Sequence, residues 1–257
     1  MRVALAGKGG AGKTTLSATL ARLLAAEGIT VVAVDADSNP NLGLALGLGR
    51  DIVPVGLPAS VVSRKIGGPG LTMGVDETLA AHGLVGPDGI RLIHMGMPLH
   101  ADEGCLCSAH AAVSALLGDL GEDPATVTLV DMEASPEHLS RGTARHVDLL
   151  LLVAEPYYRA LETARRLAVL AAELPIPRVA VVTNKIRSDS DTQAVRAFCE
   201  RHDIELIATI PWDDEVLGAD VDRRPLVDAA PDGAVMRAMP ELIAAAGFVR
   251  RPAVREP

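Results

Sequence analysis

Aromatic residues are scarce in this chain of 257 residues, where Phe, Trp and Tyr together contribute 2%. A hydrophobic core must therefore be built mainly from Ala, Val, Leu and Ile, which suit helices packed closely over a parallel sheet. Hydrophobic residues make up 49% of the chain, which is enough to bury one large α/β core. We expect a single domain over residues 1–257, with a frayed tail at 249–257.

Three other features are missing or rare, and each narrows the possible functions. Cysteine occurs three times and no signal peptide precedes the first apolar run, so we expect a cytoplasmic protein with reduced thiols. No apolar run approaches the roughly 20 residues that span a bilayer, and the C-terminal segment is a poor amphipathic anchor. The net charge of −9 gives no general support for binding nucleic acid or an anionic membrane.

Short apolar runs alternate with helical patterns along the chain. The apolar runs predict strands buried on both faces at 3–6, 31–35, 90–95, 127–131, 148–154, 178–183 and 205–210. The helical patterns fill 13–26, 108–119, 137–145, 159–174, 191–202 and 233–246. This alternation predicts an α/β fold, a doubly wound and mainly parallel sheet with helices on both faces and a ligand site at the carboxyl ends of the strands. The Gly- and Pro-rich stretch 50–75 is expected to be a surface excursion.

The segment GKGGAGKT at residues 7–14 matches the phosphate-binding pattern G-x-x-x-x-G-K-[ST]. It lies between a predicted strand and a predicted helix, where small residues let successive backbone N–H groups turn toward phosphate oxygens. We expect Lys13 to reach the β- and γ-phosphates and Thr14 to offer its hydroxyl group to Mg²⁺. The other expected nucleotide-binding positions of this P-loop are Gly9, Gly10, Ala11, Gly12 and Thr15.

A second lysine, Lys8, stands early in this loop. The pattern KGGxGKTT resembles the deviant Walker A family of P-loop ATPases, which includes the MinD and ParA ATPases and the nitrogenase iron protein. In that family the early lysine implies a homodimer, because it crosses the interface and contacts the nucleotide of the other subunit. A cation from a second subunit stabilises phosphate charge only when that subunit docks. The resemblance implies that Lys8 and Lys13 are catalytic.

Two acidic segments at predicted strand ends resemble the switches of this family. The segment DADSNPN resembles switch I, which implies that Asp37 positions the attacking water or the Mg²⁺ shell, while Asp35 closes the strand. A plain helix cap is the alternative. The segment VTLVDMEAS resembles the Walker B and switch II region, where Asp131 would hold a Mg²⁺-bound water. Relatives usually carry Gly at the position of Ser135, and we hypothesise that hydrolysis is slow for this reason.

Two further strand ends resemble the base pocket of the family. Asn184 and Lys185 follow one strand, and an Asn amide can pair with both donor and acceptor edges of adenine. Pro211, Trp212 and Asp213 end the next strand and resemble the second wall, although Trp212 fits a half-buried packing residue equally well. The TKxD spacing of guanine-specific relatives is missing, which favours ATP.

A pair of cysteines, Cys105 and Cys107, lies between a predicted strand and a predicted helix. Extended backbone would put both sulfurs on one side, and a helix N-terminus would favour thiolates. Two thiolates cannot complete a tetrahedral soft-metal site, but two copies meeting across a two-fold axis supply four. The spacing alone fits two small buried cysteines equally well. We expect Cys199 to be a core residue, and His100 and His110 to be solvated loop residues.

Taken together, these motifs resemble the maturation ATPases of carbon monoxide dehydrogenase over nearly the whole chain. The stretches that carry this resemblance are GKGGAGKTT, VDADSNPNL, GCLC, DMEASPEHLSRGTA, AEPYYRALETA, TNK and IPWDDEV. The resemblance implies an ATP-dependent dimer that binds Ni²⁺ through the paired cysteines and delivers it to carbon monoxide dehydrogenase or a related client enzyme. Thiolates also favour Zn²⁺.

Two other functions stay open. An iron–sulfur reductase like the nitrogenase iron protein takes a cysteine from a segment just beyond switch II, and residues 131–146 contain no cysteine. A positioning or partition ATPase of the MinD or ParA kind needs a membrane anchor or a basic DNA-binding surface, and neither is expected here. A cluster held only by the Cys-x-Cys pairs of two copies keeps the reductase open, whereas the MinD and ParA classes give no reason for the cysteine pair.

Overall fold

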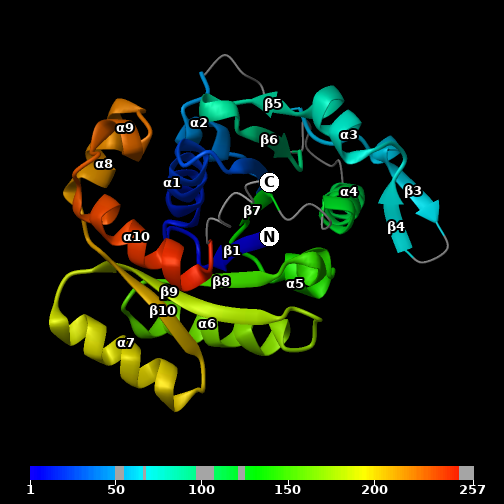
Figure 1. Cartoon of the computed structure of the whole chain (residues 1–257). Coiled ribbons are helices and arrows are strands. Elements are labelled where there is room, and N and C mark those ends of the chain that lie inside the picture. The colour runs from blue at the N-terminus through cyan, green and yellow to red at the C-terminus, as the bar shows by residue number, and fades with distance from the viewer. Residues whose placement is uncertain (50–54, 66–67, 97–106, 121–124, 249–257) are drawn as a thin grey trace, which may run out of the picture.

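The described part of the chain, residues 1–49, 55–65, 68–96, 107–120 and 125–248, contains one eight-stranded sheet in this computed structural model (Figure 1). Its strands are β1 (Arg2–Gly7), β2 (Thr30–Ala36), β5 (Leu84–Val85), β6 (Arg91–His94), β7 (Thr126–Met132), β8 (Leu149–Ala154), β9 (Arg178–Ile186) and β10 (Glu205–Pro211). Their order is β10-β9-β8-β1-β7-β2-β6-β5, and β5 pairs antiparallel with β6 while the other neighbours are parallel. The predicted doubly wound α/β fold is confirmed.

Helices cover both faces of the sheet (Figure 1). One face packs against α1 (Lys13–Ala26), α2 (Leu42–Leu46), α8 (Asp214–Asp222), α9 (Leu226–Ala229) and α10 (Ala234–Ala246). The other packs against α3 (Val75–His82), α4 (Cys107–Asp119), α5 (Glu137–Ser140), α6 (Tyr158–Ala171) and α7 (Asp189–Arg201). Short 3₁₀ helices occur at η1 (Ala59–Val61), η2 (Pro87–Gly89) and η4 (Thr143–His146). No helix in these ranges is long and apolar enough to cross a membrane.

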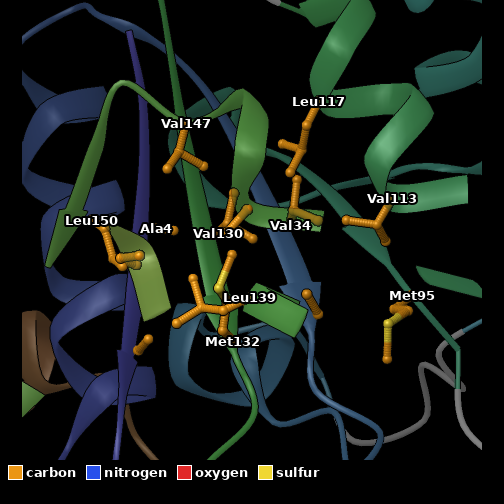
Figure 2. Packing of buried hydrophobic residues seen from close by; sticks show 14 of the residues in the cluster. Ala4, Val34, Met95, Val113, Leu117, Val130, Met132, Leu139, Val147 and Leu150 are labelled. Atoms are coloured by element: carbon orange, nitrogen blue, oxygen red, sulfur yellow. The ribbon is translucent and has the colours of Figure 1, made fainter. Parts of the chain in front are cut away.

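Side chains of successive strand residues point to opposite faces of the sheet, so they pack into two separate hydrophobic cores. On β1, Val3 and Leu5 pack under α1 and α10, whereas Ala4 packs toward α4 and α6. Figure 2 shows the second core, where Val34 and Val130 lie near Val113 and Leu117 of α4, while Leu150 lies beside Ala4. Small and medium aliphatic side chains fill both cores. Because both faces are buried, the strands read as continuous apolar runs rather than as an alternation.

The parallel register brings chemically active residues to one edge of the sheet. The carboxyl ends of β1, β2, β7, β8 and β9 lie together, which is where ligands bind in open α/β sheets. The pairing of β2 with β7 sets Asp35 beside Asp131, and the pairing of β2 with β6 sets His94 beside Asp35. Two acidic residues far apart in sequence thus become neighbours on adjacent strands.

The stretch expected to be a surface excursion is more ordered than its composition suggests. It contains the antiparallel hairpin of β3 (Val62–Lys65) and β4 (Gly68–Leu71), and α3 begins at its end. The hairpin is tied to α4, because the carboxylate of Asp119 accepts a hydrogen bond from the backbone N–H of Leu71 (2.9 Å). Local sequence carries no sign of this contact. Positions 50–54 and 66–67 of that stretch, and the tail 249–257, lie outside the described residues.

The other differences are short elements and one broken helix. The helix expected over 137–145 is two pieces, α5 and η4, because Gly142 between them has a positive φ of 68°. Strand β5 and helices α2, α3, α8 and α9, at nine residues or fewer, were not predicted. Short elements bury too few side chains to establish a visible period in the sequence.

Truncation of a residue between the sheet and its helices should show how strongly the second core stabilises the fold. Leu150→Ala, at a fully buried position, should lower the free energy of unfolding by about 2–5 kcal/mol, because it leaves a cavity. Leu44→Ala makes the same change at a side chain that is 52% exposed and should cost much less. Urea unfolding of both variants measures the difference, and equal losses would contradict the described packing.

Candidate functional site

The loop between β1 and α1 has the backbone shape of an anion cradle. Gly10 and Gly12 have positive φ angles of 80° and 94°. A Cβ on Gly12 would also collide with the side-chain nitrogen of Asn184, so both backbone angle and space require glycine there. Gly12 is the N-cap residue of α1, and no side chain among the described residues accepts a hydrogen bond from the first N–H groups of this helix. The first N–H groups of α1 can therefore be satisfied by an anion.

Lys13 and Thr14 begin α1 and face the buried acid at the end of β7. The Thr14 hydroxyl donates a hydrogen bond to Oδ2 of Asp131 (2.6 Å), and the Ser17 hydroxyl donates to Oδ1 (3.4 Å). Lys13 is buried, with Nζ 3.4 Å from the carbonyl oxygen of Lys8. Burial lowers the pKa of Lys13, although the nearby Asp131 and Asp37 oppose this. Ser17 was not predicted, but it stands one helical turn after Thr14 and so shares its face.

The carboxyl groups at this edge are strongly desolvated. Burial raises the pKa of Asp131 to about 7 and that of Asp35 to about 6. The Asp35 carboxylate accepts a hydrogen bond from the backbone N–H of Leu42 (2.8 Å), so it fixes the start of α2 as well as closing β2. His94 lies 3.7 Å from Asp35, but burial lowers the pKa of His94 to about 4. This imidazole is neutral at pH 7, and the contact is no ion pair.

The donor set at this edge suits Mg²⁺. Asp37 follows β2, is half-buried, and accepts a hydrogen bond from the backbone N–H of Asn39 (2.8 Å). Hydroxyl and carboxylate oxygens are the ligands that Mg²⁺ prefers, and it usually keeps waters and phosphate oxygens in the rest of its shell. Among the described residues, no group of three or more His, Cys, Asp or Glu side chains could enclose a metal ion. The Thr14 hydroxyl and the Asp37 carboxylate fit an ion that completes its shell with waters and phosphate oxygens.

Lys8 lies at the surface, in a network that the sequence did not reveal. Its Nζ donates a hydrogen bond to the hydroxyl of Tyr157 (3.1 Å), which in turn donates to Glu155 (2.7 Å). Glu155 also forms a salt bridge with Lys185 (2.7 Å), whose Nζ donates to the carbonyl oxygen of Gly10 (2.6 Å). These contacts connect the P-loop, at Lys8 and Gly10, to residues at the ends of β8 and β9. Glu155 follows β8, so the rule that active residues gather at carboxyl strand ends could have found it.

A cavity of about 320 Å³ lies beside the P-loop. The predicted base-pocket residues all line it, namely Asn184, Lys185, Pro211, Trp212 and Asp213. Its wall also includes P-loop and α1 residues, among them Gly10, Gly12 and Thr15. The ring of Trp212 is partly exposed and stacks under the guanidinium of Arg187, 3.9 Å from the ring centroid. The structure thus brings the predicted P-loop and base-pocket residues into one site.

Two of the predicted base-pocket residues, Asn184 and Asp213, form hydrogen bonds with the backbone of the protein itself. The amide of Asn184 donates a hydrogen bond to the carbonyl oxygen of Ala11 (2.8 Å) and accepts one from the N–H of Lys185 (2.9 Å). One N–H and one lone pair of this amide are left for a ligand. Asp213 caps α8, accepting from the N–H of Glu215 (3.0 Å), and also accepts from the N–H of Val235 (3.1 Å).

The segment after β7 connects the two predicted switches. Glu133 accepts a hydrogen bond from the hydroxyl of Ser38 (3.0 Å), which joins this segment to the residues after β2. Ser135 has no positive φ, and its hydroxyl accepts a hydrogen bond from the N–H of Glu137 (3.2 Å) at the start of α5. The backbone of this chain therefore does not use the freedom of glycine at position 135.

Cys107 is the first residue of α4 and is exposed, and its sulfur accepts a hydrogen bond from Arg141 (3.1 Å). Cys105 and His100 lie outside the described residues. The expectation of a solvated His110 is wrong: this side chain is buried in the first turn of α4, with its ring 4.6 Å from that of His138. It lies on the side of α4 that packs against α5 and η4, where its Nδ1 is 3.4 Å from the hydroxyl of Thr143. The expected core position of Cys199 is confirmed.

This combination of a parallel sheet, a glycine-rich loop and buried acids at one edge defines a P-loop nucleotide-binding protein. The family model of the CobQ/CobB/MinD/ParA nucleotide binding domain matches residues 3–226. The chain belongs to this family and is an ATPase of the P-loop class.

Relatives agree with this assignment. The chain is 36% identical to the carbon monoxide dehydrogenase accessory protein CooC of Rhodospirillum rubrum, covering 86% of this chain and 87% of that protein. It is 34% identical to an ATP-binding protein of Methanocaldococcus jannaschii, covering 88% and 91%. The MinD cell division protein of Aquifex aeolicus has the same fold, with a TM-score of 0.73 at 20% identity over 99% of this chain and 100% of that one. A MinD from Pyrococcus horikoshii, solved with Mg-ADP, has a TM-score of 0.71 at 19% identity, over 96% of each chain.

The amide of Asn184 should be needed to hold the P-loop. Asn184→Ala would leave the buried carbonyl group of Ala11 without this hydrogen bond, at a cost of about 1–3 kcal/mol in unfolding free energy. Because the loop loses its support, ATP should also bind more weakly. Gln193→Ala, on the exposed side of α7, is the control and should stay within about 0.5 kcal/mol of the wild type. Urea unfolding and ATP titration test both, and an Asn184→Ala protein as stable as the wild type would contradict this role.

Proposed function

We propose that this chain is a dimerising metallochaperone ATPase that binds nickel through paired Cys-x-Cys motifs and delivers it to carbon monoxide dehydrogenase or a related enzyme. The observation that carries the proposal is the position of Cys107. It begins α4 and contacts Arg141, which directly follows α5 and the switch II segment. The 36% identical accessory protein of carbon monoxide dehydrogenase supports the choice of client.

In the proposed mechanism ATP binds with its phosphates in the loop 7–14. The N–H groups of Gly9, Gly10, Ala11, Gly12 and Thr15 would surround the phosphate oxygens. Lys13 would hold the β- and γ-phosphates, and its low solvation strengthens this attraction. Thr14 and Asp37 would hold Mg²⁺, with Asp131 on a metal-bound water. When bound, this ion neutralises charge that builds up on the transferred phosphoryl group. The adenine would lie in the cavity lined by Asn184, Lys185, Pro211, Trp212 and Asp213.

Two copies would complete the phosphate site. Lys8 is half-buried, and within its own subunit its Nζ donates a hydrogen bond to Tyr157 and lies 5.5 Å from the centroid of that ring. We infer that docking of a second copy releases Lys8 from Tyr157 and moves it onto the phosphates of the partner. An exposed hydrogen bond of this kind is weak, so its loss would oppose docking only slightly. Asp37 would then position the water that attacks the γ-phosphate.

The same docking would complete the metal site. Each copy would supply Cys105 and Cys107, and four thiolates would surround one Ni²⁺ or Zn²⁺. Hydrolysis would loosen the dimer and weaken the hold on the metal, so that the ion passes to the client enzyme. Since ATP and metal would both favour the closed dimer, each should raise the affinity for the other.

Lys8→Ala should separate nucleotide binding from hydrolysis. The variant should bind ATP with an affinity close to that of the wild type, because the P-loop is intact, but lose most of its ATP hydrolysis. An arginine finger supplied in trans contributes on the order of 10³-fold or more to such a reaction. Tyr157→Phe removes the hydrogen bond within the subunit but keeps Lys8, so it should retain hydrolysis. Hydrolysis at the wild-type rate in Lys8→Ala would exclude the role in trans.

The metal site is tested by nickel titration of the fully reduced protein. Wild-type protein should bind about one Ni²⁺ per dimer, and more tightly with a non-hydrolysable ATP analogue than without it. The double variant Cys105→Ser/Cys107→Ser should lose this binding yet keep its ATP affinity. Cys199→Ala changes the buried third cysteine and should leave nickel binding intact.

Each outcome of this titration bears on a separate part of the proposal. Nickel binding that survives the double substitution would reject the cysteine site. Equal nickel affinity with and without the analogue would reject the coupling. A parallel Zn²⁺ titration identifies the preferred metal.

A further inference from the structure

Asp37, which is proposed to hold Mg²⁺ and to position the attacking water, lies in a short segment between β2 and α2. Ala36 before it ends β2, and α2 begins at Leu42. Two local hydrogen bonds shape the turn, since the N–H of Asp37 donates to Asp35 (3.3 Å) and its carboxylate accepts from the N–H of Asn39 (2.8 Å). Such bonds set the shape of the turn but not its place against the rest of the protein. Contacts of the two residues that flank Asp37 set that place.

On one side of Asp37, a buried histidine holds the end of β2. His138 is on α5, and its Nε2 lies 2.7 Å from the carbonyl oxygen of Ala36. Burial, with a smaller contribution from His110, lowers the pKa of His138 to about 4, so the ring is neutral near pH 7 and carries one proton. A carbonyl group can only accept, so this proton is on Nε2.

The other ring nitrogen of His138 is buried and has no hydrogen-bond partner in the described part of the chain. With the proton on Nε2, this Nδ1 is an acceptor, and a buried acceptor without a donor costs free energy. An apolar ring of similar size would fill the same space without that cost. What the imidazole adds at this position is therefore the hydrogen bond to Ala36. A buried polar group that is left unpaired calls for an explanation of this kind.

The direction of the His138 ring is set by its neighbours. The ring of His110, on α4, lies 4.6 Å away at an angle of 59°. Nδ1 of His110 is in turn 3.4 Å from the hydroxyl of Thr143 in η4. Elements on three sides thus fix the imidazole, and it can hold the carbonyl of Ala36 without losing further side-chain freedom.

On the other side of Asp37, the hydroxyl of Ser38 donates a hydrogen bond to Oε2 of Glu133 (3.0 Å). Glu133 directly follows β7. Burial acts to raise the pKa of Glu133, but hydrogen bonds from the side chains of Ser135 and Ser38 outweigh it and hold the pKa below its usual range. Glu133 is therefore a carboxylate at neutral pH, and its hydrogen bond with Ser38 is charge-assisted. One segment, residues 133–138, thus holds both neighbours of Asp37.

Resting on the proposed function, we infer that His138 and Glu133 are positioning residues for ATP hydrolysis. They hold the backbone on either side of Asp37 and so set where its carboxylate lies relative to the phosphate loop. Both act through Asp37, and a displacement of about 1 Å at such a group can slow a reaction by as much as 10²-fold. Because both residues follow β7, a shift of the switch II segment would move Asp37 with it.

Hydrogen exchange and steady-state kinetics of His138 variants test this role. His138→Phe keeps an aromatic ring but removes the donor. In protein without nucleotide or metal, the amides of residues 37–41 should then exchange several-fold faster. The kcat for ATP should fall by about 10-fold, while ATP affinity stays near that of the wild type because the P-loop is unchanged. His138→Gln keeps a side-chain N–H donor and should restore part of both properties.

Two further variants complete the experiment. Ser38→Ala removes the contact with Glu133 and should speed exchange over the same segment and lower kcat. His202→Phe makes the matched change at an exposed ring that follows α7 and precedes β10, at the opposite edge of the sheet, and should behave like the wild type.

The outcomes separate this inference from the proposed function. Wild-type exchange and kcat in His138→Phe, with Asp37→Asn defective in hydrolysis, would overturn the role of His138, and the same result in Ser38→Ala would overturn that of Glu133. Faster exchange over the whole chain, with no rescue by His138→Gln, would show a merely structural role and also overturn the inference. Wild-type hydrolysis in Asp37→Asn would overturn the proposed role of Asp37 and this inference with it. If His138→Phe does not fold, Ser38→Ala decides alone.

Discussion

The hydrogen bond between Thr14 and Asp131 joins the two halves of the nucleotide site. Thr14 belongs to the helix after the P-loop, and Asp131 ends a strand at the centre of the sheet. Burial raises the pKa of Asp131 to about 7, so the carboxylate form is costly without a nearby donor or cation. The helix supplies donors in Thr14 and Ser17, and Lys13 supplies a charge nearby. The loop, the helix and the acidic strand ends therefore depend on one another, and this dependence places the phosphate cradle against the acids.

Sequence reasoning predicted the parts of this arrangement that rest on strong local patterns. The seven long strands of the main sheet were identified within about three residues at each end, because strands buried on both faces are continuous apolar runs. The P-loop followed from spacing, and α1 was predicted with its observed bounds. The short hairpin of β3 and β4 was not predicted, because its position depends on a contact between Leu71 and Asp119 that local propensity does not encode.

The site was predicted less completely than the fold, for a similar reason. Residues with a motif, such as Lys13 and Asn184, were found, whereas Glu155, Tyr157 and Arg141 have roles that depend on which side chain packs against them. His110 illustrates the limit. A histidine next to a cysteine motif suggests a solvated loop or a ligand, but the first turn of α4 buries it against His138. Successive residues of a helix point about 100° apart, so one turn of α4 carries an exposed side chain at Ser108 and a buried one at His110.

Electrostatics gives a physical reason for dividing both proposed sites between two copies. Each chain has a net charge of −9, so two copies repel at long range, and thiolates and nucleotide phosphates add further negative charge. Cations at the points of contact offset this repulsion only over short distances, since salt screens charges beyond about 10 Å. Lys8 stands in the phosphate loop, where the proposed mechanism needs such a cation. In the proposed mechanism these short-range attractions become available only when ATP and metal are bound. The negative net charge would then favour separation of the copies after hydrolysis, and so promote release of the metal.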